Sequence, residues 1–310
     1  MNQQYWKFLR FCWKGEVYEF KTLPFRLAMA PITFTKLLHP VAASLRSQGI
    51  RLLIYLDDIL VAAQTSTLAV QQMSLTISLL ESLGFVLNWK KCVLNPEQNL
   101  EFLGFQVNTV SMTLSLPSEK LKNIRKECHH WLQTQGITPR QLAHLIGLMT
   151  SSALAILSAP LHYRGLQMLR RSRALARSHQ NYDSSIPWTQ EALQDLEWWI
   201  EQMSDCNGRL ILLPRQADVF LESDASKQGW GAYCRNTEER TGGSWTLREK
   251  QDHINILELQ AAFLTIQTFL KFRSNVHVLI YLDNTVAVQY INRMGGTHCA
   301  VCHCNCGSGA

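Results

Sequence analysis

Residues 50–63 are Ile-Arg-Leu-Leu-Ile-Tyr-Leu-Asp-Asp-Ile-Leu-Val-Ala-Ala, and they place Asp57 and Asp58 between two apolar runs. The length and β-branched content of both runs predict two buried strands joined by a turn. Desolvating unpaired carboxylates is unfavourable, so a divalent metal at the tip of this hairpin would stabilise it. A solvent-exposed Asp-Asp turn without metal is the alternative, and this stretch alone leaves it open.

Three further segments surround the turn in a fixed order. They are LPFRLAMAP (Leu23–Pro31, continued by Phe34-Thr35-Lys36), GFVLNWKKC (Gly84–Cys92) and EFLGF (Glu101–Phe105). Together with the turn they resemble a reverse transcriptase of the retrotransposon kind, closest to the DIRS-type elements. In that family they correspond to the LPFGLxxAP segment, the segment after the YxDD turn and the primer-grip strand. The resemblance implies a polymerase palm in which Asp57 and Asp58 hold metal ions, with an RNA template and a DNA primer as partners.

The resemblance implies that the first unit, residues 1–116, is a partial fingers and palm, and local patterns predict its elements. They are a hairpin over Trp6–Phe20, helices over Pro31–Ser47 and Thr67–Leu83, and short strands within Val86–Gln106. In the second helix the apolar residues Val70, Met73, Ile77 and Leu80 predict the buried face. The fold class expected for the whole chain is α+β with an α/β part.

Residues 117–209 are predicted to be a helical connection, with helix starts at Ser118, Thr138-Pro139 and near Pro187. Between positions 116 and 180 ten Lys and Arg residues stand against Glu119 and Glu127. Such a stretch attracts a phosphate backbone, although solvated helix faces explain the charge equally well. The residues best placed for a nucleic-acid-binding patch are Arg170, Arg171, Arg173 and Arg177.

The third unit, residues 210–296, carries a second set of carboxylates. A strand over 219–224 ends in Asp224, a helix over Asn255–Phe272 carries Glu258, and a strand over Val276–Leu282 precedes Asp283. Strands are also predicted at Trp230–Arg235 and Gly243–Leu247. If the first and last strands are neighbours in a mixed sheet, Asp224 and Asp283 meet at one edge and Glu258 leans toward them.

Clustered carboxylates of this kind bind Mg²⁺ (or Mn²⁺) together with substrate phosphate oxygens. Each residue also has a purely structural interpretation. Asp224 can cap the turn at Ala225-Ser226, Asp283 can cap a helix that begins at Thr285, and Glu258 can be an ordinary first-turn helix acid.

The motifs around these carboxylates resemble a ribonuclease H domain. They are SDAS (Ser223–Ser226) with GWGA (Gly229–Ala232), NILELQA (Asn255–Ala261), and LDNT (Leu282–Thr285) with Tyr290-Ile291-Asn292. The resemblance covers about residues 218–296 and implies cleavage of the RNA strand of an RNA–DNA hybrid, with Asp224, Glu258 and Asp283 as metal ligands.

The chain departs from both families at three points. The third metal-binding Asp of the palm lies upstream of Trp6 in the family, and the fourth ribonuclease H carboxylate lies beyond Asn292, so we expect a chain truncated at both ends. Arg26 occupies a family glycine position, where a side chain hinders close backbone approach. Ribonuclease H cleavage is therefore the activity expected to survive, and an inactive nucleic-acid-binding remnant is the alternative.

Composition sets the broad class. With 310 residues, 46% hydrophobic and 17% charged, the chain is long enough for more than one globular domain. No apolar run predicts a membrane span and no signal peptide is visible, so an intracellular location is expected. Of nine cysteines, four crowd into residues 297–310 (Cys299, Cys302, Cys304, Cys306). That tail matches a haem-attachment pattern and contains enough Cys and His for zinc, but we expect it to be unstructured.

Overall fold

The computed structural model describes residues 3–175, 184–211, 216–274 and 276–295. The chain divides into two compact units, Met1–Leu103 and Gly104–Ala310. The finer division at 116 and 209 stays a prediction. Both units mix helices with sheets, so the predicted fold class is confirmed.

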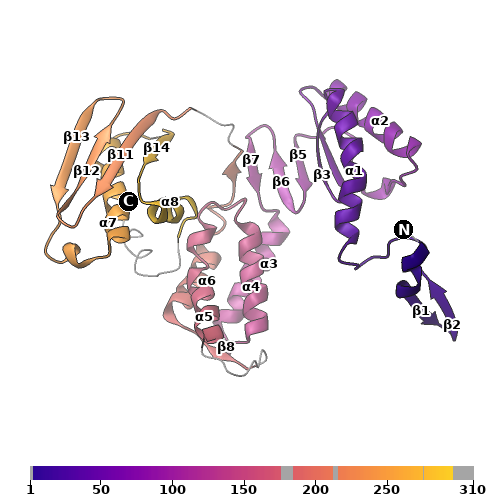
Figure 1. Cartoon of the computed structure of the whole chain (residues 1–310), viewed down its shortest axis with the longest axis horizontal. Coiled ribbons are helices and arrows are strands. Elements are labelled where there is room, and N and C mark those ends of the chain that lie inside the picture. The colour runs from indigo at the N-terminus through magenta and orange to yellow at the C-terminus, as the bar shows by residue number, and fades with distance from the viewer. Residues whose placement is uncertain (1–2, 176–183, 212–215, 275, 296–310) are drawn as a thin grey trace. The chain divides into compact units, whose positions relative to one another are not determined.

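The first unit is built from two hairpins and two long helices (Figure 1). Its elements are β1 (Arg10–Trp13), β2 (Glu16–Glu19), α1 (Ala30–Ser47), β3 (Arg51–Tyr55), β4 (Asp58–Ala62), α2 (Ser66–Ser82) and β5 (Asn99–Phe102), with 3-10 helices at Gln3–Leu9 and Trp89–Lys91. The predicted hairpin around Lys14-Gly15-Glu16 is confirmed, but its first strand begins at Arg10 rather than Trp6, because residues 6–9 belong to the 3-10 helix. Each predicted helix is confirmed to within one residue at either end.

Helix α1 supplies most of the core of this unit because its apolar residues recur three or four positions apart. The core consists of Leu38, Val41, Ala42, Leu45, Ile50, Leu52 and Leu80. Gly49 follows the helix with a φ of +80°, a left-handed conformation that glycine adopts without strain.

Two sequence expectations for this unit are corrected. The β3–β4 hairpin is buried on one face only: Leu52 is 6% exposed, whereas its neighbour Leu53 is 61% exposed. The reason is that a two-stranded sheet packed on a single layer of helices buries only alternate residues. No strand forms near Val86, which is 97% exposed; the strands of this region begin at Asn99.

Helix α2 also packs differently from the prediction. Val70 is 48% exposed, and the buried positions are Gln72, Thr76 and Leu80. The buried hydroxyl of Thr76 donates a hydrogen bond to the carbonyl of Gln72 in the same helix, so it needs no partner outside the helix. The buried face predicted from the apolar residues of α2 therefore differs from the observed buried face by part of a helical turn.

The second unit begins with a small antiparallel sheet and a helical bundle. Its elements here are β6 (Phe105–Asn108), β7 (Thr113–Ser115), α3 (Ser118–Leu132), β8 (Gly136–Ile137), α4 (Pro139–Ser152), α5 (Arg164–Leu175), β9 (Ile186–Pro187), α6 (Gln190–Glu201) and β10 (Arg209–Leu210), with a 3-10 helix at Ala159–Leu161. The predicted helical character and its three starts are confirmed, because α3 begins at Ser118 and the N-caps of α4 and α6 are Thr138 and Thr189.

The rest of this unit is a four-stranded mixed sheet with helices. Its elements are β11 (Val219–Ala225), β12 (Gly229–Cys234), β13 (Glu239–Ser244), α7 (Ile254–Leu270), β14 (Val278–Tyr281) and α8 (Thr285–Asn292), with a 3-10 helix at Glu249–Gln251. The strand order is β13-β12-β11-β14, and β11 pairs β14 in parallel, so the predicted adjacency of these two strands is confirmed. Helix α7 packs on β11 and β12. The strand predicted at Gly243–Leu247 is instead β13, which starts at Glu239.

Candidate metal-binding carboxylate cluster

Asp224 lies near the end of β11, opposite Gly231 of β12. Its side chain is exposed, and one of its carboxylate oxygens (Oδ1) accepts a hydrogen bond of 2.8 Å from the backbone N–H of Ala225. This bond to the adjacent residue does not cap the turn, so the turn-capping interpretation of Asp224 is wrong. Ser226 caps the turn instead, because its Oγ accepts from the backbone N–H groups of Gln228 and Gly229. The bond to Ala225 uses only one of the two Asp224 carboxylate oxygens, so the other remains available to a ligand.

Glu258 lies in the second turn of α7, which begins at Ile254 and is capped by His253. It is only 3% exposed, and its Oε2 atom is buried without a hydrogen-bond partner. Burial, followed by the nearby charges of Asp283 and Asp224, raises the pKa of the Glu258 carboxyl to about 7. The interpretation of Glu258 as an ordinary first-turn helix acid is therefore wrong. A buried carboxylate oxygen without a donor is suited to a cation.

Asp283 follows β14 after one intervening residue, Leu282. The structural alternative made it the N-cap of the next helix, and that alternative is wrong. Asn284 caps α8 instead, since its Oδ1 accepts from the backbone N–H groups of Val286 and Ala287. The sequence reasoning missed this role of Asn284, although asparagine is a favoured N-cap residue and stands directly before the helix. Asp283 is exposed and is not used as a cap.

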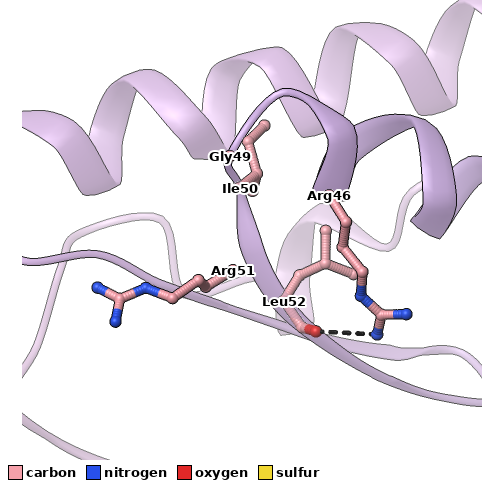
Figure 2. A pocket seen from close by; sticks show the side chains of 5 residues that line it. All are labelled: Arg46, Gly49, Ile50, Arg51 and Leu52. Atoms are coloured by element: carbon pink, nitrogen blue, oxygen red, sulfur yellow. Dashed lines mark hydrogen bonds between the residues drawn. The ribbon is translucent and has the colours of Figure 1, made fainter.

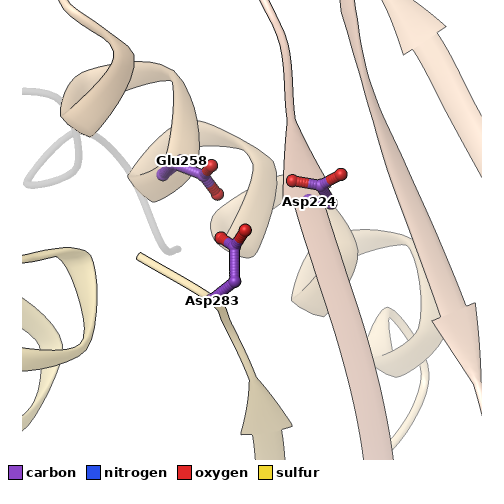
Figure 3. A group of neighbouring side chains, drawn as sticks. All are labelled: Asp224, Glu258 and Asp283. Carbon is purple, nitrogen blue, oxygen red and sulfur yellow. The ribbon is translucent and has the colours of Figure 1, made fainter. Parts of the chain in front are cut away.

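Ligand oxygens of Asp224, Glu258 and Asp283 all lie within 4.8 Å of one another (Figure 3). In the described part of the chain they are the only group of three or more His, Cys, Asp or Glu side chains that could share a metal ion. All donors are carboxylate oxygens, the ligands that Mg²⁺ and Mn²⁺ prefer. The orphaned Glu258 oxygen and the mutual repulsion of three acids fit a divalent cation.

Asp57 and Asp58 lie side by side at the turn of the β3–β4 hairpin. Both are exposed at the β3–β4 hairpin, where Leu56 adopts a left-handed φ of +53° and Asp58 already pairs with Tyr55 as the first residue of β4. The structure thus places them at a tip, as predicted. Among the described residues they belong to no group of three potential ligands.

A shallow cavity of about 340 Å³ lies at the opposite end of β3 from this tip. It is lined by Arg46, Gly49, Ile50, Arg51 and Leu52 (Figure 2). The guanidinium of Arg46 donates to the Leu52 carbonyl over 3.2 Å, which ties the end of α1 to β3. None of the predicted site residues lines this cavity.

The predicted basic patch is described in part. Arg170 and Arg171 lie on α5 and are exposed. Arg173 also belongs to α5, but its side chain lies outside the described residues, as do Arg177 and the Cys-rich residues 297–310. In the described ranges no helix is long and apolar enough to cross a membrane.

Comparison with known proteins identifies the first part of the chain. Residues 1–107 match the family described as reverse transcriptase (RNA-dependent DNA polymerase). They form a reverse transcriptase domain. The sequence is also homologous to viral polyproteins: it is 23% identical over 288 residues to the genome polyprotein of Petunia vein clearing virus and 25% identical over 295 residues to the enzymatic polyprotein of Cauliflower mosaic virus.

These similarities extend well beyond the reverse transcriptase domain. They cover 88% and 89% of this chain, which spans only 12% and 39% of the two relatives. Two solved structures of the foamy viral protease-reverse transcriptase, one in complex with ds DNA and one with RNA/DNA hybrid, match with TM-scores of 0.58 and 0.56. They cover 93% and 94% of this chain, and the chain covers 48% and 38% of theirs. At 17% identity this likeness shows the fold.

Proposed function

We propose that this chain is a DIRS-type retroelement reverse transcriptase and ribonuclease H fragment that hydrolyses the RNA strand of RNA–DNA hybrids. The observation that carries the proposal is the convergence of Asp224, Glu258 and Asp283 within 4.8 Å. Its parts would be a partial fingers and palm (1–116), a helical connection (117–209) and a ribonuclease H-like domain (210–296). A solved relative of the same fold in complex with RNA/DNA hybrid supports the choice of substrate.

Asp224, Glu258 and Asp283 would hold Mg²⁺ or Mn²⁺. The bound cation would activate a water and stabilise the leaving oxygen of a phosphodiester. The exposed carboxylates of Asp224 and Asp283 form the side of the cluster that a nucleic-acid phosphate can approach. Glu258, which is only 3% exposed, forms the buried side of the cluster.

Protonation of Glu258 competes with metal binding, because a carboxylate must be ionised to act as a ligand. With its pKa raised to about 7, Glu258 is largely protonated at pH 6 and largely ionised at pH 8. Metal affinity is therefore expected to rise across this interval.

The reverse transcriptase domain is the second candidate centre. Asp57 and Asp58 would bind the polymerase metals, with an RNA template and a DNA primer as partners. Hydrolysis is favoured over polymerisation because the described residues bring three carboxylates together at Glu258 and only a pair at the β3–β4 tip.

The test is cleavage of a labelled RNA–DNA hybrid in the presence of Mg²⁺. Asp224→Asn is expected to abolish cleavage, because it removes a ligand charge while keeping the size of the side chain. Asp205→Asn, the same change at an exposed residue of the helical region, should leave the rate unchanged. Absence of cleavage by the unaltered chain, with hybrid binding that weakens steeply as salt rises, would instead indicate an inactive nucleic-acid-binding remnant.

A further inference from the structure

Asn284 uses both ends of its side-chain amide. Its Oδ1 accepts from the backbone N–H groups of Val286 and Ala287, each at 3.0 Å, and so caps α8. Its Nδ2 donates to Oδ1 of Asn255 over 2.9 Å. The cap determines the orientation of the amide, because only the oxygen can accept from two N–H groups. The nitrogen is therefore the end that reaches Asn255.

This hydrogen bond joins the two elements that carry Glu258 and Asp283. Asn255 lies in the first turn of α7, one helical turn before Glu258, and Asn284 directly follows Asp283. Both asparagines are partly buried, and α7 packs against α8. The link is thus adjacent to the carboxylate cluster at both of its ends.

Without a cation the carboxylates repel one another, and Asp283 lies on a short loop between β14 and α8. Repulsion favours displacement of that loop away from α7. A neutral amide–amide bond opposes this displacement without adding a charge to the cluster.

We propose that Asn284 and Asn255 are positioning residues that hold the Asp283 loop against α7, so that Asp283 and Glu258 stand at metal-binding separation before the cation arrives. The inference rests on the proposed metal-dependent hydrolysis. It adds two residues to that site, Asn284 and Asn255, which hold together the elements that carry the metal ligands and do not themselves bind the metal.

Asn284→Ser is the decisive variant, because serine keeps a capping oxygen for α8 but has no nitrogen to reach Asn255. Partners that orient metal ligands typically change metal affinity about 10- to 100-fold when removed, so Mg²⁺ binding measured by calorimetry should weaken about tenfold or more. The kcat for hybrid cleavage should fall while KM stays unchanged. Asn292→Ser makes the same change at the exposed end of α8 and should alter neither quantity.

Asn255→Ala removes the same bond from its other end and serves if the serine variant does not fold. In the double variant the loss of Mg²⁺ affinity should equal that of one single variant, since both changes delete one interaction. Additive losses would overturn the proposal, as would Mg²⁺ affinity that both single variants retain.

Hydrogen exchange of the amides of residues 282–284 in metal-free protein separates this inference from the proposed function. Exchange should accelerate in Asn284→Ser and not in Asn292→Ser. If the unaltered chain binds Mg²⁺ but cuts no hybrid, the proposed hydrolysis is wrong and metal affinity still decides the positioning role. If it binds no Mg²⁺, the exchange rates decide, and equal rates in both variants would overturn the role.

Discussion

Glu258 combines near-complete burial with a carboxylate oxygen that no protein donor reaches. Its raised pKa, about 7, means that the folded chain holds a proton which the unfolded chain releases near pH 4.5. The contribution of this group to stability is therefore fully present below pH 4.5 and is lost as pH rises to about 7. In metal-free buffer at pH 8 the ionised Glu258 destabilises the fold.

Glu258→Gln should consequently raise the free energy of unfolding at pH 8 in metal-free buffer by about 1–2 kcal/mol, with screening by solvent included. Well below pH 4.5 the two proteins should be equally stable, because Glu258 is then neutral in both the folded and the unfolded chain. Urea unfolding at the two pH values measures this. Added Mg²⁺ should stabilise the unaltered chain and not the variant, and the same Mg²⁺ response in both would contradict the assigned role.

At the scale of elements, Asp195 of α6 accepts a backbone hydrogen bond from the first turn of α5. The side chain of Asp195 is buried, and its Oδ2 accepts a hydrogen bond of 3.0 Å from the backbone N–H of Leu166. The pKa of Asp195 is raised to about 7. Burial is the cause, and the hydrogen bonds from the backbone of Leu166 and Gly165 offset only part of its effect. This carboxylate satisfies N–H groups that every helix start leaves unpaired.

Asp195→Asn keeps an accepting oxygen and removes the buried charge. Above pH 7 it should stabilise the chain by about 1–3 kcal/mol, with no gain near pH 4, because the raised pKa disfavours folding only where Asp195 is ionised. The variant is best measured in a chain that already carries Glu258→Gln, since Glu258 titrates in the same interval. A loss of stability at pH 8 would show that the second backbone hydrogen bond outweighs the burial of charge.

In the loop before α1, the backbone of Arg26 adopts a left-handed conformation. Arg26 has a φ of +69°, in the left-handed region, at the position where the resemblance of Leu23–Pro31 implies a glycine. A side chain makes this conformation unfavourable by about 1–2 kcal/mol. Arg26 thus adopts a backbone conformation that a glycine would adopt without strain.

Arg26→Gly is expected to stabilise the loop by about 1 kcal/mol, because relief of strain exceeds the added freedom of the unfolded chain. Slower amide exchange over residues 21–34 would measure it. Arg26→Ala keeps the β-carbon and should show no such gain. Equal slowing in both variants would trace the effect to the arginine charge rather than to the backbone.

At the scale of the whole molecule, a hybrid duplex must be attracted by positive charge, and the chain carries a formal net charge of +6. Arg170 and Arg171 are exposed on α5, whereas Lys122 is paired with Glu119 over 2.9 Å. Among the described residues neither arginine forms an ion pair, so both are better placed than Lys122 to replace counterions on a phosphate backbone.

Replacing both Arg170 and Arg171 with Gln should lower the slope of log K against log salt by about 1–2, since each phosphate contact contributes about 0.9. Hybrid binding titrations at several salt concentrations measure the slope, and Lys122→Gln should leave it unchanged. An unaltered slope in the double variant would place the nucleic acid on another face.

The sequence by itself determined the order and type of most elements. The helix starts at Ser118, at Thr138 and near Pro187, and the hairpin around Gly15, depend on residues that are neighbours in the chain. Local rules therefore suffice for them. Carboxylates at strand ends also depend on local pattern, which is why Asp224 and Asp283 could be singled out. The same rules misjudged the buried face of α2 and the exposure of Leu53, because burial depends on what packs against each face.

Only the tertiary structure decided what the carboxylates can do together. The parallel pairing of β11 with β14 and the packing of α7 bring Asp224, Glu258 and Asp283 within 4.8 Å, although they are distant in the chain. Tertiary packing also buries Glu258. The structure further shows that Asn284 caps α8, so Asp283 is not used as a cap. Distances between segments are set by sheet order and packing rather than by local propensity, and for that reason the sequence could identify these residues but not their separation.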